Sequence, residues 1–85
     1  MSVYKAYCLV QIENGQRSYV TPELKYWTAD PRKAYFYDSI EEAESDMQYH
    51  IDRDEYSYPY MIEHDSNYTK PEYKIEEVEI KVWEV

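Results

Sequence analysis

Residues 3–12 alternate between two sets of side chains, which is the pattern of a β-strand. One set is apolar throughout and consists of Tyr4, Ala6, Cys8, Val10 and Ile12. The other set is mixed and consists of Val3, Lys5, Tyr7, Leu9 and Gln11. Because successive side chains of a strand point to opposite faces of the sheet, we expect one buried face and one mixed face.

A β-hairpin is predicted at Asn14-Gly15, the strongest short signal for a two-residue type I′ turn. Gly15 is the only glycine in the chain, which supports this position for the turn. The return strand is expected from about Arg17 to Thr28. Pro22 lies within it and implies an edge position, a bulge or a brief break, because proline cannot donate a ladder hydrogen bond.

A short helical turn is predicted after this strand. Asp30-Pro31 matches an N-cap followed by proline at the first helical position, and we expect a single turn ending at Ala34. Residues 35–37 are then a short connector or strand that leads into the main helix.

The main helix is predicted from Asp38 to Glu55. Ser39 and Glu42 have the spacing of a capping box, in which the two residues satisfy each other's backbone N–H groups. The apolar positions follow at gaps of three and four: Ile40, Ala43, Met47 and then His50 or Ile51. This stripe predicts one buried helix face with a charged face opposite.

The C-terminal third is predicted to be extended. Pro59 is expected to stop the helix, so residues 56–63 are interpreted as a short edge strand or an extended aromatic loop. Residues 64–72 are rich in turn formers and predict a loop. A strand is predicted from Tyr73 to Val85, and its apolar positions change parity at Glu76-Glu77, which is the pattern of a β-bulge.

Together these elements predict one α+β domain over residues 1–85. Its sheet is antiparallel with three to four strands, and one helix packs on a face, in the order β-β-α-β-β. A chain of 85 residues buries a small core. Twelve tyrosines, two tryptophans and one phenylalanine must supply much of its area.

Charge is concentrated in the predicted main helix. Residues 38–55 hold eight carboxylates and one base, Arg53, and so carry seven of the nine net negative charges of the chain. A helix whose charges served only solubility would interleave lysine and arginine with its acids. Two interpretations therefore remain: the anionic face is functional, or it only keeps the helix soluble. The net charge of −9 disfavours direct binding to nucleic acid or to anionic membranes.

Cys8 is the single cysteine and has no partner for an internal disulfide. Its apolar neighbours predict a small buried hydrophobe rather than a nucleophile. The sequence shows no signal peptide and no apolar run long enough to span a bilayer, so we expect a cytoplasmic protein in a reducing compartment.

No catalytic or metal-binding motif is apparent, and an enzyme is not predicted. The two histidines, His50 and His64, have no nucleophile beside them in a recognisable context. Asp52, Asp54 and Glu63 match three positions of a calcium loop, but a serine replaces the required glycine. No cofactor is expected, although a weak divalent-cation site is kept as an alternative.

Recognition of another protein is the remaining hypothesis. Tyr56, Tyr58 and Tyr60 alternate directly after the acidic helix, and tyrosine is enriched at interface hot spots. The competing interpretation is that these rings complete the rim of the core. The candidate protein-binding residues are Glu41, Glu44, Asp46, Asp52, Asp54, Glu55, Tyr56, Tyr58 and Tyr60.

The run from Asp30 to Ala43 resembles a pattern found in many small phage and prophage proteins. In that pattern a short K-A turn and an aromatic residue precede S-x-E-E-A at a helix start. The resemblance covers about a sixth of the chain and implies a fold fragment. Small acidic, tyrosine-rich phage proteins of this size also resemble anti-restriction and anti-CRISPR inhibitors, several of which mimic DNA by filling a nucleic-acid channel with carboxylates.

These observations lead to one functional hypothesis and two alternatives. The hypothesis is a phage-encoded, non-enzymatic inhibitor in the cytoplasm of a bacterial host. Its predicted partner is a host protein with a basic surface, such as a nuclease or another nucleic-acid-binding protein. The alternatives are a small structural domain that forms a homodimer through an exposed sheet edge, and the weak divalent-cation binder.

Overall fold

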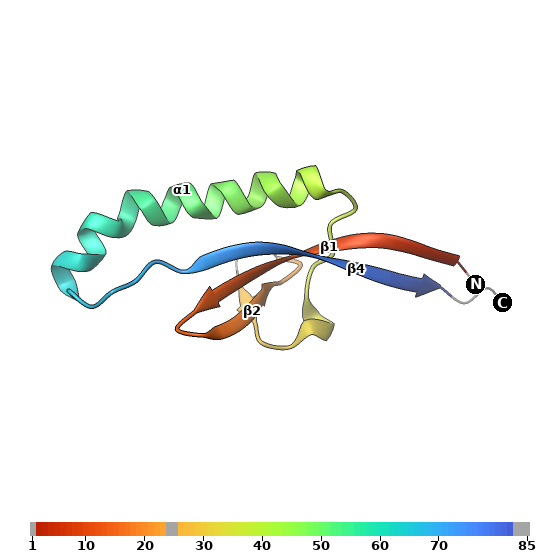
Figure 1. Cartoon of the computed structure of the whole chain (residues 1–85), viewed down its shortest axis with the longest axis horizontal. Coiled ribbons are helices and arrows are strands. Elements are labelled where there is room, and N and C mark those ends of the chain that lie inside the picture. The colour runs from red at the N-terminus through yellow and green to blue at the C-terminus, as the bar shows by residue number, and fades with distance from the viewer. Residues whose placement is uncertain (1, 24–25, 83–85) are drawn as a thin grey trace.

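Four strands and one long helix form the structure, a computed structural model that describes residues 2–23 and 26–82 (Figure 1). In chain order the elements are β1 (Ser2–Glu13), β2 (Gln16–Val20), β3 (Trp27–Thr28), the 3-10 helix η1 (Pro31–Lys33), α1 (Ile40–His64) and β4 (Glu72–Val82). All strand pairs are antiparallel, in the order β3-β2-β1-β4, and α1 lies along one face of the sheet. The predicted α+β class is therefore confirmed, but the element order is β-β-β-α-β rather than the predicted β-β-α-β-β, because three strands precede the helix and residues 56–63 belong to it.

The predicted hairpin joins β1 to β2. Glu13 lies opposite Gln16, which leaves Asn14 and Gly15 as the two turn residues. Both have positive φ, 53° at Asn14 and 78° at Gly15, as a type I′ turn requires. Asparagine and glycine adopt this left-handed conformation at lower cost than other residues, so local sequence alone places the turn.

The return strand breaks before Pro22, one of the three possibilities that this proline implies, but the prediction of a single strand from Arg17 to Thr28 is wrong. Strand β2 ends at Val20, two residues before Pro22, and the chain turns back as β3 with Trp27 opposite Val20. Leu24 and Lys25, which the predicted strand included, lie outside the described residues. Strand β3 forms the outer edge of the sheet, so the long predicted strand is two short antiparallel ones.

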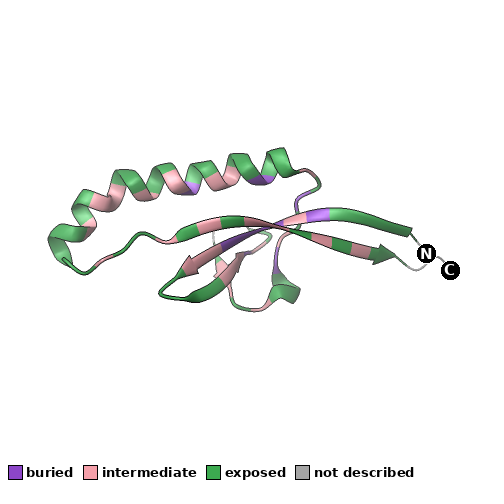
Figure 2. Cartoon of the chain, in the orientation of Figure 1, coloured by how far each residue is buried: buried purple, intermediate pink, exposed green. Residues whose placement is uncertain are grey.

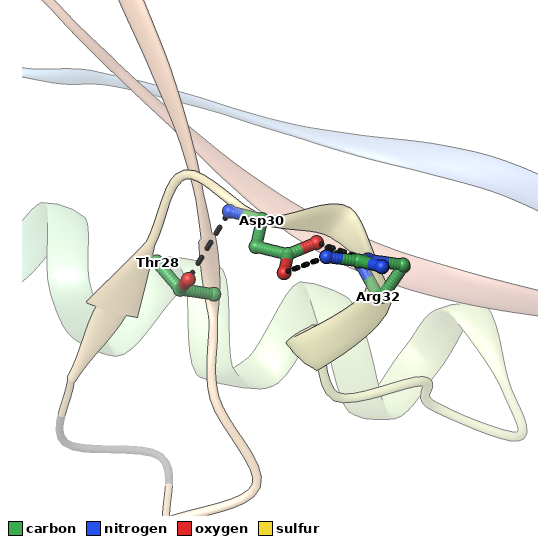
Figure 3. Close-up of polar contacts among 3 residues, drawn as sticks. All are labelled: Thr28, Asp30 and Arg32. Atoms are coloured by element: carbon green, nitrogen blue, oxygen red, sulfur yellow. Dashed lines mark hydrogen bonds and ion pairs between the residues drawn. The ribbon is translucent and has the colours of Figure 1, made fainter.

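Asp30 caps η1 as its sequence predicts (Figure 3). Its Oδ1 accepts a hydrogen bond from the Arg32 backbone N–H at 3.0 Å. The Arg32 guanidinium donates to both carboxylate oxygens of Asp30 at 3.1 Å. The Asp30 backbone N–H donates to Thr28 Oγ1 at 3.1 Å, which ties the cap to β3.

Helix α1 begins at Ile40, two residues after the predicted Asp38, and ends at His64, nine residues after the predicted Glu55. Ser39 is the N-cap, and its Oγ accepts from the Glu42 backbone N–H at 3.3 Å. The prediction that Pro59 stops the helix is wrong, because Pro59 lies inside it and residues 56–63 form neither strand nor loop. Tyr58, next to Pro59, contacts the ring of Tyr68 beyond the helix, and Figure 1 shows α1 bending near this end.

Strand β4 pairs with β1 without interruption, from Glu72 opposite Ile12 to Val82 opposite Ser2. The predicted bulge at Glu76-Glu77 is therefore wrong within the described residues; Trp83 to Val85 lie outside them. The apolar residues of β4 change from odd-numbered to even-numbered positions for another reason. Helix α1 covers the face of Tyr73 and Ile75, whereas Val78 and Ile80 face the opposite side, where the Pro31–Phe36 segment lies.

Glu76 and Glu77 lie between the part of β4 that is covered on one sheet face and the part that is covered on the opposite face. Glu76 shares the face of Cys8, its partner on β1, and forms an ion pair with Arg17. Glu77 lies on the other face, where its Oε1 is 3.0 Å from Lys5 Nζ. Each carboxylate therefore has a basic partner in a regular strand.

The core lies between α1 and the sheet, with Leu9, Val20, Tyr37 and Ala43 at its centre. Leu9 belongs to the mixed set of β1, so the mixed face is the one beneath the helix. Ala6, Cys8 and Val10 of the apolar set are also buried, as predicted, but Tyr4 is 49% exposed. This difference follows from the shape of the molecule, because β1 and β4 project as a two-stranded ribbon beyond the N-terminal end of α1 (Figures 1 and 2).

Candidate protein-binding surface

The outward side of α1 carries most of the predicted acidic residues. Glu41, Glu44, Asp52 and Glu55 are all exposed, as the helical periodicity predicts. Asp52 Oδ1 accepts a hydrogen bond from Gln48 Nε2 at 2.9 Å, one helical turn away. We call these four carboxylates the acidic face of α1.

Asp46 and Asp54, also predicted to bind a partner, are turned toward the sheet. Asp46 Oδ2 accepts a hydrogen bond from Tyr37 Oη at 2.7 Å, and Asp54 Oδ2 accepts one from Tyr73 Oη at 2.5 Å. Each aspartate is only partly exposed. These two carboxylates therefore hold α1 against the sheet, a role that α-helical periodicity alone does not show.

Burial and the bonds to aspartate raise the pKa values of Tyr37 and Tyr73. Burial, followed by the hydrogen bond to Asp46, raises the pKa of Tyr37 far above its ordinary value of 10. Burial and the bond to Asp54 raise the pKa of Tyr73 to about 12. Both phenols therefore remain protonated donors at neutral pH, as their carboxylate acceptors require.

Three tyrosines project from the solvent side of α1. The exposed fraction of the residue is 65% for Tyr49, 90% for Tyr56 and 62% for Tyr60. Their spacing of seven and then four residues places them on one face of a helix. We call this set the tyrosine stripe; it lies beside the acidic face.

Tyr58 is not part of this stripe, although the sequence groups it with Tyr56 and Tyr60. It is half-buried, with its ring 6.2 Å from that of Tyr68 and 5.0 Å from Lys70 Nζ. The alternating pattern suggested a strand or extended loop, in which residues 56, 58 and 60 share a side. In a helix, residue 58 faces inward and residue 49 joins the outer set, so a spacing of four and seven is the signal that identifies Tyr49.

His50 belongs to the core, because its ring is only 6% exposed. It stacks on Tyr73 at 5.7 Å between centroids and meets the edge of Trp27 at 5.2 Å. Its Nδ1 has no hydrogen-bond partner among the described residues. Burial, with a smaller effect of Arg53, lowers the pKa of His50, while Asp54 and Asp46 oppose the shift.

The possible calcium ligands do not surround a common point. Residues 52–63 are helical, so Asp52, Asp54 and Glu63 do not form a loop. In the described part of the chain, no three His, Cys, Asp or Glu side chains are grouped closely enough to hold a metal ion. Between residues 2 and 82, omitting 24 and 25, no helix is long and apolar enough to cross a membrane.

The fold and this surface define a small α+β protein with an acidic and aromatic helix exposed on one side. The chain matches no protein-family model, no curated protein and no solved structure.

Proposed function

We propose that this chain is a non-enzymatic, protein-binding inhibitor that uses the solvent side of α1. The observation that carries the proposal is the tyrosine stripe. Its three large rings are 62–90% exposed on one face of α1, where Tyr49 and Tyr60 also contact the rings of His50 and His64. Rigid aromatic rings with a polar tip are the side chains that most often anchor protein interfaces.

The acidic face supports a partner with a basic surface. Its four carboxylates border the tyrosine stripe, and the chain as a whole carries a net charge of −9. Long-range attraction would accelerate encounter with a positively charged protein, and burial of the rings would then retain it. Arg53 is the only base between residues 38 and 55, so little within the helix offsets this field.

The finer proposal is that the partner is a bacterial nuclease or another nucleic-acid-binding protein, and that the chain is phage-encoded. Charge supports the partner class, because a surface that binds phosphates also attracts carboxylates. Bound there, α1 would block access by the nucleic acid without binding nucleic acid itself. The phage origin rests on the sequence resemblance of residues 30–43.

The test begins with capture of partners from a bacterial lysate at low and at raised salt, followed by titration of the purified partner. Replacing Tyr49, Tyr56 and Tyr60 by serine should weaken binding by at least about 100-fold, since hot-spot residues each contribute about 2 kcal/mol or more. Reversing Glu44, Asp52 and Glu55 to lysine should reduce the association rate and its salt dependence.

A matched control is Tyr4→Ser, which removes an exposed tyrosine from the sheet ribbon rather than from α1. It should leave binding unchanged. The proposal is wrong if the triple serine variant binds as tightly as the native chain while its melting temperature is also unchanged. Partner binding that competes with nucleic acid would support the finer proposal, and binding without competition would exclude it.

A structural or oligomeric role is the second candidate function. The observation that favours it is the outer edge of β4, which pairs with no strand of the described chain.

A further inference from the structure

The outer edge of β4 is accessible where the β1–β4 ribbon extends past α1 (Figure 1). Strand β4 is the last strand of the sheet, and among residues 2–23 and 26–82 only β1 pairs with it. An unpaired edge presents free backbone donors and acceptors that can bind another strand. The question is therefore which strand its side chains would accept.

Residues 78–82 present a different chemistry on each face of the ribbon. Val78, Ile80 and Val82 share one face, since Ile80 lies opposite Tyr4 and Val78 opposite Ala6. Val82 is 44% exposed, so this apolar face is incompletely covered. Glu79 and Lys81 lie on the other face, opposite Lys5 and Val3. Within the described residues, Lys81 forms no ion pair.

We propose that β4 pairs antiparallel with β4 of a second copy of this chain, about a twofold axis at Ile80. Ile80 then lies opposite the partner's Ile80, and Val78 lies opposite the partner's Val82. On the other face, Glu79 lies opposite the partner's Lys81, and the twofold repeats this contact. Every directly opposed pair from 78 to 82 is then apolar with apolar or acid with base, which stabilises antiparallel strands.

Over residues 78–82, neighbouring registers lack this complementarity. A twofold axis at Glu79 places two glutamates opposite each other, and one at Lys81 does the same for two lysines. An axis at Val78 places Ile80 opposite the partner's Glu76. Registers that differ by one residue are excluded, because moving one strand by a single residue turns every side chain to the opposite face of the sheet. We therefore compare only registers that differ by an even number of residues. Segment 78–82 contains one acid and one base, so the pairing is locally neutral in a chain of net charge −9.

The dimer would be a closed assembly with one continuous eight-stranded sheet. A twofold axis perpendicular to the sheet places both copies of α1 on the same face. The tyrosine stripe and the acidic face of each copy remain exposed, so the dimer is independent of the proposed partner binding. The incompletely covered apolar faces of the two ribbons would instead become continuous.

Charge exchange on the full chain tests the register. Sedimentation velocity should show a dimer whose dissociation constant rises about tenfold or more in Lys81→Glu, which places like charges opposite each other twice. Lys81→Glu faces Val3 within its own chain, so it leaves the existing ion pairs intact. The double variant Glu79→Lys with Lys81→Glu should restore the dimer. A monomeric native chain, or a double variant as weak as Lys81→Glu, would overturn the proposal.

A cysteine at the twofold axis provides a second readout. Ile80→Cys should form an intermolecular disulfide under mild oxidation, because the two cysteines would lie directly opposite each other. Lys74→Cys is the matched control, since it is exposed on the same strand and the same face but lies six residues from the proposed twofold axis, so its two copies would be far apart. Equal cross-linking of the two variants, or none with Ile80→Cys, would contradict the pairing.

Discussion

Tyr73 Oη on β4 donates a hydrogen bond to Asp54 Oδ2 on α1 at 2.5 Å. A second bond of the same kind, from Tyr37 Oη to Asp46 Oδ2, lies eight residues earlier on the helix. Eight residues are slightly more than two helical turns, so both aspartates face the sheet. Two phenol–carboxylate bonds therefore anchor a helix whose apolar stripe is narrow.

Removing the hydroxyl of Tyr73 should destabilise the fold. We expect Tyr73→Phe to lower the free energy of unfolding by about 1.5–3 kcal/mol, the range for a hydrogen bond to a charged group. Asp54→Asn should cost less, because the amide oxygen still accepts from the phenol. Chemical denaturation measures both, with Tyr56→Phe as the exposed control. Additive effects in the double variant would show that the two groups do not interact.

His50 should make stability depend on pH in the mildly acidic range. Burial lowers its pKa below the ordinary 6.5, so the native ring is neutral while the unfolded ring takes up a proton below pH 6.5. The unfolded state then binds more protons, and the free energy of unfolding declines as the pH falls from 6.5 toward the native pKa. Above pH 6.5 the contribution of His50 is fully present.

Denaturant unfolding at pH 7.5 and 5.5 measures this dependence. His50→Phe retains a ring beside Tyr73 and Trp27 but removes the titration, so the difference between the two pH values should shrink. His64 lies exposed at the end of α1, and His64→Phe is the matched control for loss of an imidazole. An unaltered pH dependence in His50→Phe would show that other groups cause it.

Replacing Pro59 should stabilise the long helix. Proline has no N–H for the Glu55 carbonyl four residues earlier, and its ring disfavours a straight helix. Pro59→Ala is expected to raise the free energy of unfolding by about 1–3 kcal/mol and to increase the helical signal in circular dichroism. Glu63→Ala is the exposed control. A loss of stability would mean that the bend at Pro59 is required for the contact between Tyr58 and Tyr68.

Gly15 should be sensitive to substitution for conformational reasons alone. A Cβ added at Gly15 meets no atom within 4 Å, so Gly15→Ala encounters no steric clash with neighbours. Its φ of 78° nevertheless costs alanine about 1–2 kcal/mol. Thermal unfolding should show this loss, whereas Gln16→Ala, next along the chain, should be nearly neutral. An equal loss of stability in Gly15→Ala and Gln16→Ala would show that the loss comes from the strand and not from the conformation of the turn.

The features that local sequence determines are those that depend on a few neighbouring residues. The Asn14-Gly15 turn, the Asp30 and Ser39 caps and the presence of a strand near each end of the chain were all predictable. Each follows from a backbone preference or a hydrogen bond within about four residues. The exposed positions of Glu41, Glu44, Asp52 and Glu55 follow in the same way, because helical periodicity alone specifies them.

Only the tertiary structure determines those features for which the local preference of the sequence and the packing of distant segments favour different conformations. Pro59 opposes a helix locally, yet contacts such as that of Tyr58 with Tyr68 retain one, and this determines that Tyr49 rather than Tyr58 joins Tyr56 and Tyr60. The parity change in β4 arises because different segments cover its two faces. The hydrogen bonds of Asp46 and Asp54 depend on Tyr37 and Tyr73, which lie outside α1. Contacts of this kind depend on how separate elements pack, which no short stretch of sequence contains.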